Sequence, residues 1–250
     1  MKVREKIVYS RVAERELLLD AYLPNEDKPR PAVLVVHGGA WKSGNRKQLA
    51  SYATALCKRG FPCFAIDYRL APKHKFPAQI EDCRAALVWI RKHAKEYNVD
   101  PTRIGAIGYS AGGHLVSLLG TTGTVSDGED TRLQAVAAGG APTDFRWFPD
   151  NGKWAEYWMG GDLTEVADKF QAASAAAFVD KDDPPMFFFN GDQDELVPVA
   201  WTKNCYDALK GAGVKTEMHI VKGAKHIPAA RDVEALQKAY EFLARELVAE

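Results

Sequence analysis

Short apolar runs alternate with amphipathic segments along most of the chain. Each run is almost continuously apolar, which is typical of a strand that is covered on both faces of its sheet. The sequence therefore predicts a series of buried strands rather than strands with one wet face. These runs lie at residues 32–36, 63–66, 104–107, 135–138, 186–189 and 216–221.

The segments between the runs carry apolar residues at three-to-four spacing, which predicts helices. Strands and helices that alternate in this way form a mostly parallel, doubly wound sheet with helices on both faces, here of about eight strands. Two earlier runs, at 7–9 and 16–23, have no helix between them and predict an antiparallel hairpin at one edge. The predicted helices cover residues 46–59, 80–97, 114–119, 199–211 and 232–247.

One segment, residues 144–183, breaks this alternation. It has no clear strand and concentrates large apolar side chains, so we expect either a small lid that lines a pocket or a pair of short helices packed on the core. The remainder leaves room for little or no further cap, and residues 1–250 are predicted to form one domain. The large side chains are Phe145, Trp147, Phe148, Trp154, Tyr157, Trp158 and Met159.

The charge balance argues against several classes of partner. The 250 residues include 33 Lys+Arg and 33 Asp+Glu, a formal net charge of zero, and no basic run exceeds two residues. Nucleic acid is therefore not an expected partner, and an uncharged substrate fits the balance. The sequence has no apolar stretch long enough to predict a membrane span. The charged residues 1–6 argue against a signal peptide, so a cytoplasmic location is predicted, while the oligomeric state is not readable.

The four cysteines are scattered along the chain and form no C-x-x-C motif. No Cys/His cluster has the spacing of metal ligands, so neither a metal nor another cofactor is expected. Buried, reduced thiols are the simplest interpretation because three of the four stand among apolar residues. The cysteines are Cys57, Cys63, Cys83 and Cys205.

Residues 108–112 read G-x-S-x-G, with Ser110 at the centre. The motif follows the predicted strand 104–107 and precedes the helical run 114–119, which is the strand-turn-helix context of a nucleophile elbow. The glycines are needed because the turn is tight and flanking Cβ atoms would clash with neighbouring chain. Ser110 is therefore the candidate nucleophile.

Residues 37–41 read H-G-G-A-W and directly follow the predicted strand 32–36. Two glycines let backbone N–H groups approach a substrate oxygen, and in hydrolases this loop supplies an oxyanion donor beside the N–H that follows the nucleophile. We expect donors from Gly39, Ala40 and Ala111. His37 is expected to bond within the loop, and Trp41 either walls an acyl pocket or packs on the sheet.

A serine hydrolase needs a base and a carboxylate that orients it, and in the hydrolase-fold order the acid follows the serine and the base follows the acid. His219 lies inside the predicted strand 216–221, where sheet packing would fix its side chain. His226 lies in the loop that follows, where doubly wound sheets place their chemistry, and it is the favoured base. His114 follows Ser110 by one helical turn and is expected to be a packing residue.

The acid is expected in the loop after the strand 186–189. Asp192 and Asp194 both stand at the carboxyl end of that strand, and Glu195 is a weaker third candidate. Asp192 could instead form a turn by bonding its own backbone. Spacing favours Asp194 only modestly and leaves the choice open.

Taken together, these motifs resemble the α/β-hydrolase family. Within it they are most similar to the small lipase/esterase branch related to hormone-sensitive lipase and to bacterial carbohydrate esterases of the feruloyl and acetyl-xylan type. The resemblance extends over nearly the whole chain. The matching segments are residues 37–41, 67–72, 76–78, 108–113, 191–198 and 223–226.

The resemblance implies roles for residues that spacing alone left undecided. Its G-x-x-D-x-x-V-P pattern resolves the acid to Asp194, and its G-x-x-H pattern agrees with His226. Asp67 and Arg69 correspond to a structural pair near the floor of the site. The chain departs from the pattern where Ala40 replaces a third glycine, and Asn190-Gly191 and Ser174-Ala175 replace His-Gly and Ser-Pro.

A serine carboxylesterase acting on short-chain acyl esters, small or attached to a polysaccharide, is the predicted function. Carbohydrate-linked acetyl or feruloyl esters are included in that class. An arylformamidase-type amide hydrolase is an alternative, because those enzymes resemble this chain in the H-G-G-x-W loop and the G-x-S-A-G elbow. A non-catalytic hydrolase-fold binding protein is an alternative of another class. Trp41 and Tyr109 are candidate substrate contacts.

Overall fold

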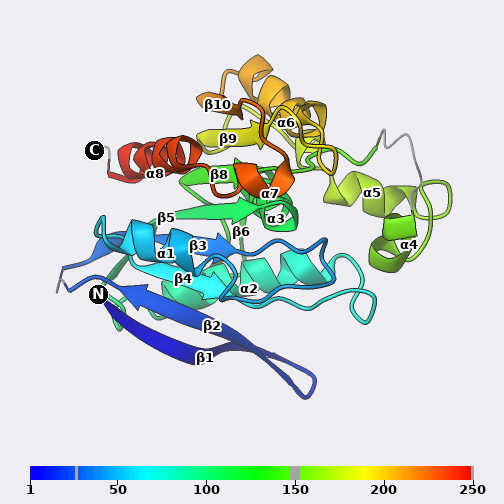
Figure 1. The fold of residues 1–250 in the computed structure, drawn as a ribbon. Coiled ribbons are helices and arrows are strands. Elements are labelled where there is room, and N and C mark those ends of the chain that lie inside the picture. Colours follow the sequence, from blue (N-terminus) through cyan, green and yellow to red (C-terminus); the bar gives the residue numbers. More distant parts are fainter. Residues whose placement is uncertain (26–27, 147–152, 249–250) are drawn as a thin grey trace.

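A computed structural model describes residues 1–25, 28–146 and 153–248. Within these residues, one sheet has the strand order β1-β2-β4-β3-β5-β8-β9-β10, and β6 and β7 form a separate small hairpin (Figure 1). The strands are β1 (Lys2–Val12), β2 (Arg15–Leu23), β3 (Arg30–Val36), β4 (Cys63–Ile66), β5 (Val99–Tyr109), β6 (Val125–Ser126), β7 (Glu129–Asp130), β8 (Ala135–Gly139), β9 (Met186–Gly191) and β10 (Thr216–Val221).

The predicted antiparallel edge and parallel centre are both confirmed. β1 pairs with β2 and β2 with β4 in antiparallel fashion, whereas every pair from β4 to β10 is parallel. Because parallel strands end at the same edge, the loops after β3, β5, β9 and β10 gather there. The candidate residues of all four loops are thereby brought to one side of the sheet.

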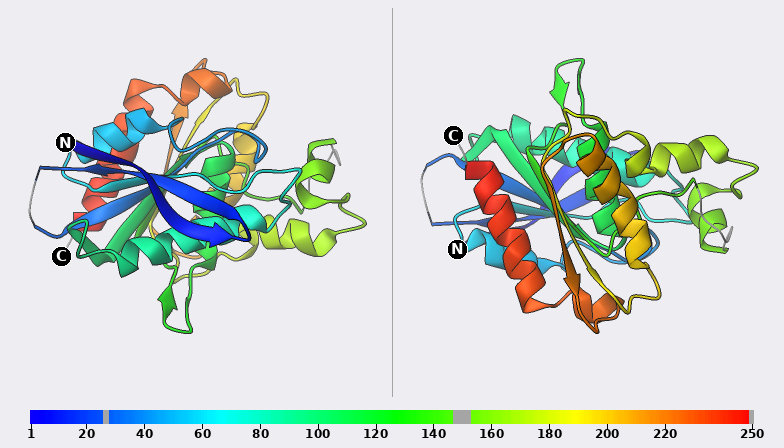
Figure 2. Two further views of the ribbon diagram at one scale, coloured as in Figure 1. Left: turned by 90° about the horizontal axis from the view of Figure 1, so that it is seen from below. Right: turned by 90° about the horizontal axis from the view of Figure 1, so that it is seen from above.

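Helices cover both faces of the sheet. α1 and α8 pack on one face, and α2, α3 and α6 pack on the other; Figure 2 shows α8 and α6 on opposite sides of the strands. This is the doubly wound arrangement of an α/β-hydrolase fold, as predicted. The helices are α1 (Ala50–Cys57), α2 (Ala78–Lys92), α3 (Ala111–Thr122), α4 (Lys153–Met159), α5 (Ala167–Ala173), α6 (Val199–Gly211), α7 (His226–Ala229) and α8 (Val233–Val248).

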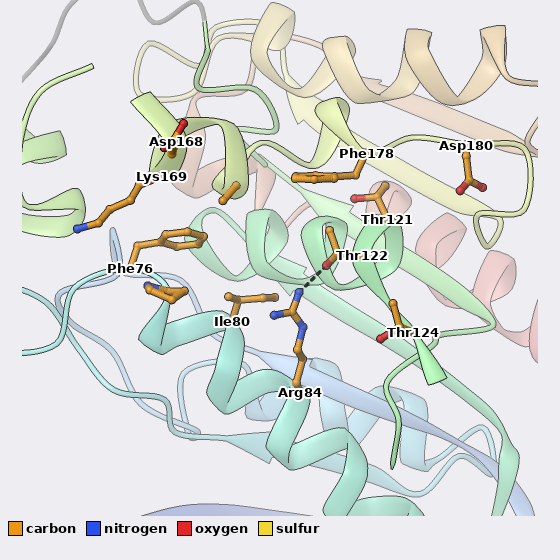
Figure 3. A pocket seen from close by; sticks show the side chains of 12 residues that line it. Phe76, Ile80, Arg84, Thr121, Thr122, Thr124, Asp168, Lys169, Phe178 and Asp180 are labelled. Carbon is orange, nitrogen blue, oxygen red and sulfur yellow. Dashed lines mark hydrogen bonds between the residues drawn. The ribbon is translucent and has the colours of Figure 1, made fainter. Parts of the chain in front are cut away.

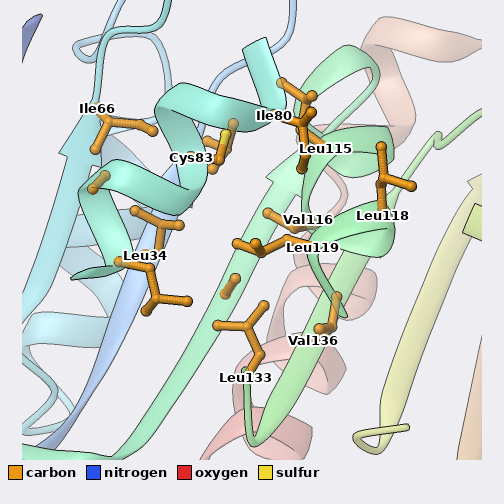
Figure 4. Packing of buried hydrophobic residues seen from close by; sticks show 14 of the residues in the cluster. Leu34, Ile66, Ile80, Cys83, Leu115, Val116, Leu118, Leu119, Leu133 and Val136 are labelled. Atoms are coloured by element: carbon orange, nitrogen blue, oxygen red, sulfur yellow. The ribbon is translucent and has the colours of Figure 1, made fainter. Parts of the chain in front are cut away.

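The core beneath α2 and α3 is continuous and apolar (Figure 4). Ile80 and Cys83 on α2 face Leu115 and Leu119 on α3, and all four are at most 1% exposed. Full burial of one such aliphatic side chain contributes about 1.5–3 kcal/mol to folding. This packing fixes α3, and with it the turn that precedes its first residue.

All four cysteines are free and buried, as expected. Burial raises the pKa of each thiol, which keeps the reactive thiolate form scarce at neutral pH. Among the described residues, no helix combines the length and apolarity that crossing a membrane requires.

Two helices are shorter than the periodicity predicts. α1 begins at Ala50 rather than at residue 46, because Arg46 is held in the preceding turn: its N–H and guanidinium both donate to Asp67 at 2.7 Å. α2 ends at Lys92 rather than at residue 97, where turns take over. Its periodic apolar residues continue into these turns because Ala94 and Tyr97 pack on the core.

The segment 144–183 forms α4, α5 and a short 3₁₀ helix, Ala175–Ala177, beyond the carboxyl ends of the strands (Figure 1). Phe145, Trp158 and Phe170 are fully buried, as expected for short helices packed on the core. Trp147, Phe148 and the side chain of Trp154 lie outside the described residues.

Candidate active site

Ser110 stands in a tight turn between β5 and α3. Its φ of 57° and ψ of −123° are unfavourable for a residue with a side chain, and its N–H donates to Gly139 O at 2.8 Å. The strand, the helix and this hydrogen bond hold the strained turn in place. The Ser110 side chain is consequently presented at the carboxyl end of the sheet, where it is partly exposed.

The two glycines of the motif are required by close backbone contacts. A Cβ atom on Gly108 would lie 2.3 Å from Gly112 O, and one on Gly112 would lie 2.0 Å from Val36 O. Both distances are far below van der Waals contact with backbone that cannot move easily. The steric reason inferred for this motif is therefore present in the structure.

His226 and Asp194 form a buried hydrogen-bonded pair. His226 Nδ1 lies 2.6 Å from Asp194 Oδ2, and the Asp194 side chain is 0% exposed. The other carboxylate oxygen accepts the N–H groups of Leu196 at 3.0 Å and Val197 at 2.8 Å. Because Nδ1 is the donor to the carboxylate, Nε2 of His226 is left as a proton acceptor.

Tyr109 positions His226 through its hydroxyl group. Its hydroxyl donates to the backbone carbonyl of His226 at 2.5 Å, and the two rings lie 5.1 Å apart. Burial raises the pKa of Tyr109, so its hydroxyl stays protonated and remains a donor. The residue is expected to contact substrate, yet its hydroxyl is committed to positioning His226.

The rival acid and base candidates are placed elsewhere. His219 lies in β10 with its Nδ1 3.1 Å from Lys238 Nζ, and Asp192 accepts the N–H of Gly223 at 2.7 Å. Glu195 is exposed. Of the candidates, the structure brings only Asp194 into contact with His226.

The loop after β3 has three consecutive residues with positive φ: Gly39 at 111°, Ala40 at 50° and Trp41 at 59°. The carbonyl of Gly39 accepts the N–H groups of Lys42 and Ser43, which closes a turn. In the described part of the chain, the N–H groups of Gly39 and Ala40 make no hydrogen bond within the protein. They are therefore available to a substrate oxygen.

Ala111 offers a third donor. It is the first residue of α3, and the first N–H groups of a helix have no acceptor within it. Ala40, Ser110, Ala111 and His226 line one cavity, so donors, hydroxyl and imidazole share the same space. The positive end of the α3 dipole also points toward this cavity.

His37 supports the loop from inside, as expected. Its Nδ1 lies 2.7 Å from Gly38 O and its ring stacks on Tyr68 at 4.1 Å. Since a carbonyl oxygen only accepts, Nδ1 carries the proton. Burial lowers the pKa of His37 and keeps the ring neutral.

Trp41 is buried against other aromatic side chains and also walls a cavity. It is 4% exposed and stacks on Trp158 of α4 at 3.7 Å, and it also lines the cavity beside Ser110. Its indole N–H donates to His114 Nδ1 at 3.1 Å. The loop after β3 is thus anchored to the short helices of residues 144–183.

His114 is a buried packing residue, as expected. Its Nε2 donates to Ala173 O at 2.7 Å while its Nδ1 accepts from Trp41, so both ring nitrogens are used by the neutral form. Burial lowers the pKa of His114 to about 4. A second proton, on Nδ1 of His114, would face the Trp41 N–H and break the hydrogen bond between the two side chains.

Stability is expected to depend on pH through His114. In the unfolded chain its pKa is about 6.5, so unfolding takes up a proton between about pH 6.5 and pH 4, and stability falls as the pH is lowered through that range. Urea unfolding at several pH values measures the slope, and His114→Gln should make it shallower by about 1 kcal/mol per pH unit. Equal slopes in the two proteins would contradict this assignment.

The expectation that Asp67 and Arg69 form a pair is wrong. Asp67 binds Arg46, whereas Arg69 binds Asp82 at 2.8 Å and Glu81 at 2.9 Å. Asp67 therefore fixes the loop before α1, and Arg69 fixes the start of α2.

Sequence reasoning did not single out several cavity residues. The Tyr157 hydroxyl donates to Ala40 O at 2.9 Å, and Tyr157, Leu196 and Trp201 line the cavity beside Ser110. Tyr157 was visible only as one of many aromatic residues in its segment. No local pattern marked Leu196 or Trp201.

Ser110 lies between two cavities that it shares with His226 and Ala40. One has a volume of about 280 Å³ and is walled by Trp41 and Trp201; the other has a volume of about 650 Å³ and opens toward α1 and α7. A ligand at Ser110 would therefore have room for one group on either side.

A third cavity, of about 650 Å³, lies between α2, the end of α3 and α5 (Figure 3). Arg84 donates to Thr122 inside it at 2.8 Å, and none of the candidate triad residues lines it. Among the described residues, no group of three or more His, Cys, Asp or Glu side chains could hold a metal ion.

Comparison with known proteins places this geometry in a family. A family model described as BD-FAE matches residues 19–209. The chain is 30% identical to esterase LipC of Mycobacterium tuberculosis over 73% of this chain and 49% of the relative. It is 33% identical to the probable carboxylic ester hydrolase LipM of the same organism over 72% of this chain and 45% of the relative. The chain thus spans about half the length of these curated relatives.

Solved structures resemble the chain over its whole length. A truncated carbohydrate esterase from gut microbiota has a TM-score of 0.91 at 28% identity, covering 100% of this chain and 97% of that one. Propionate-bound esterase 2 of Thermogutta terrifontis has a TM-score of 0.84 at 26% identity, covering 98% and 96%. The family match, the esterase relatives and the shared fold agree: this chain belongs to the BD-FAE family of α/β-hydrolase esterases.

Proposed function

We propose that the protein is a serine carboxylesterase in which Ser110 is the nucleophile, His226 the general base and Asp194 the acid that orients it. The observation that carries the proposal is the buried His226–Asp194 hydrogen bond in the loops beside the strained Ser110 turn. The pair leaves Nε2 of the imidazole free to accept the serine proton.

In the first half-reaction, Ser110 Oγ attacks the ester carbonyl as His226 Nε2 takes its proton. The N–H groups of Gly39, Ala40 and Ala111 donate to the tetrahedral oxyanion. Because these donors are fixed in place beforehand, the protein does not have to reorganise to stabilise the negative charge. The intermediate collapses, the imidazolium returns the proton to the departing alkoxide, and the alcohol leaves an acyl-enzyme.

Water completes the cycle. His226 takes a proton from water, the hydroxide attacks the acyl-enzyme, and a second oxyanion forms in the same N–H cradle. Collapse returns the proton to Ser110 Oγ and releases the carboxylic acid. Every step uses groups of this chain and water alone.

The two cavities suggest which part of a substrate lies on each side of Ser110. The cavity of about 280 Å³ is mostly apolar and lies against Ala111, which suits a short acyl group. The larger cavity, of about 650 Å³, is lined partly by polar residues and suits the alcohol side, including a sugar. Acetyl esters of carbohydrates fit this division, and a structural relative is titled a carbohydrate esterase. A feruloyl group is larger than an octanoyl group and would have to occupy the larger cavity.

Activity-based labelling and a substrate panel test the proposal. A fluorophosphonate probe is expected to label the protein stoichiometrically at Ser110, located by peptide mass spectrometry. Across p-nitrophenyl esters, kcat/KM should be highest for acetyl to butyryl and fall for octanoyl, because the acyl cavity is small.

Further arms of the panel separate the alternatives. Acetylated xylan and methyl ferulate test carbohydrate-linked esters, and N-formylkynurenine tests an arylformamidase. A higher kcat/KM on N-formylkynurenine than on every ester would replace the carboxylesterase by the amide hydrolase. If the probe did not label the protein and no substrate were hydrolysed, the non-catalytic binding protein would be the remaining candidate.

A further inference from the structure

Two cations border the larger cavity beside Ser110. Lys42 follows the oxyanion loop, and Arg231 lies just after α7, which begins with His226. Lys42 also lines the smaller cavity, and its ammonium lies 4.8 Å from the centre of the ring of Tyr157, another residue of that cavity. This cation therefore stands where the two cavities meet. Because both residues line the cavity that Ser110 also lines, a group bound between them would lie in the same space as the proposed nucleophile.

Neither cation has a carboxylate partner in the part of the chain that the structure describes. Other exposed cations near the sheet do, such as Lys47 with Glu5 at 3.2 Å. Asp232, which follows Arg231, instead caps α8 by accepting the N–H of Ala235 at 2.8 Å. The two positive charges are therefore not neutralised within the described protein.

The cavity itself carries no acidic residue among those that line it. Its polar lining groups are neutral donors or acceptors such as Ser43, Gln48 and Ser51. The acid below it, Asp194, is buried, with both oxygens engaged by His226 and backbone N–H groups. A cavity lined by charge of one sign attracts ligands of the opposite sign.

We infer that the larger cavity binds the alcohol side of an ester whose alcohol carries a carboxylate, such as a uronic acid or an aromatic hydroxy acid. The inference rests on the proposed function and names its substrate class. The zero net charge of the chain favours an uncharged substrate, but that sum hides the local excess: Lys42 and Arg231 face the site while the balancing carboxylates lie elsewhere.

A matched pair of acetyl esters tests the inference. para-Acetoxybenzoate and para-acetoxybenzamide have the same acyl group and nearly the same shape, but only the first has an anionic alcohol. The parent protein is expected to have a higher kcat/KM on the anionic ester. Lys42→Met and Arg231→Gln should each lower the anionic-to-neutral ratio about threefold, the strength of an exposed ion pair, and added salt should lower the ratio of the parent.

Lys58→Met is the matched control, because Lys58 is exposed at the end of α1 and does not line the cavity. It removes the same charge and should leave the ratio unchanged. A ratio that neither cavity variant alters, or that the control alters equally, overturns the inference while the esterase proposal stands.

Binding of the product alcohols tests the inference without turnover. para-Hydroxybenzoate should bind more tightly than para-hydroxybenzamide in isothermal titration calorimetry, and Lys42→Met should reduce the difference. Failure to hydrolyse either ester would contradict the proposed function, and equal binding of the two alcohols would contradict the anionic substrate class. The two failures are therefore distinguishable.

Discussion

Replacing Ser110 by alanine is expected to lower kcat for ester hydrolysis about 10⁶-fold, the loss seen when a serine protease loses its nucleophile. Alanine keeps the Cβ atom, so the strained turn at φ 57° is unchanged and only the attacking oxygen is removed. The Ser110 side chain is partly exposed, so stability should change by less than about 0.5 kcal/mol. Steady-state kinetics on p-nitrophenyl acetate and thermal unfolding measure the two effects.

Ser117→Ala is the matched control for this substitution. Ser117 stands on α3, the helix that follows Ser110. It is buried and donates its hydroxyl to Gly113 O at 2.8 Å, and it does not line either cavity beside Ser110. The control should keep its activity and lose about 1 kcal/mol of stability. Hydrolysis by Ser110→Ala at the parent rate would refute the assigned nucleophile, and so would equal losses of activity in both variants.

The strands could be predicted from sequence because each central strand is buried on both faces. A continuous apolar run such as 32–36 or 186–189 follows directly from that burial. The turn at Ser110 was also predictable, because the backbone contacts at Gly108 and Gly112 leave no room for a side chain. In both cases the cause lies within a few neighbouring residues.

The bracing of the oxyanion loop could not be predicted in the same way. Tyr157 bonds Ala40 across 117 positions of sequence, and Trp158 stacks on Trp41 over an equal separation. The spacing of apolar residues in a segment does not indicate which of its aromatic residues contacts a distant loop. Asp67 and Arg69 failed for a related reason: they are neighbours in a motif, but each pairs with a charged residue that is distant in sequence, Arg46 and Asp82.

This bracing changes what the segment 144–183 does. Trp158 stacks on Trp41, Trp41 donates to His114, and His114 donates to Ala173, so the loop is tied to both α4 and the end of α5. A loop with three consecutive positive φ angles needs such support, because its conformation is intrinsically unfavourable. The segment therefore fixes the loop of the proposed oxyanion donors and also walls the cavity proposed for the acyl group.

Replacing Asp194 by asparagine is expected to lower kcat about 10⁴-fold, as the corresponding change does in a serine protease. The amide oxygen can still accept the N–H groups of Leu196 and Val197, so the loop keeps its shape. The amide NH₂ then faces Nδ1 of His226, which must become an acceptor. The proton moves to Nε2, and the imidazole can no longer take one from Ser110.

Asp192→Asn separates this effect from the general loss of a carboxylate in the same loop. Asp192 accepts the Gly223 N–H at 2.7 Å, and an asparagine oxygen can accept it equally well. Its kcat should therefore stay within about twofold of the parent, because Asp192 is partly exposed and its hydrogen bond is kept. Since both variants lose one negative charge and differ by two positions, only the orientation of His226 distinguishes them. A loss of activity on Asp192→Asn with none on Asp194→Asn would transfer the role of the acid to Asp192.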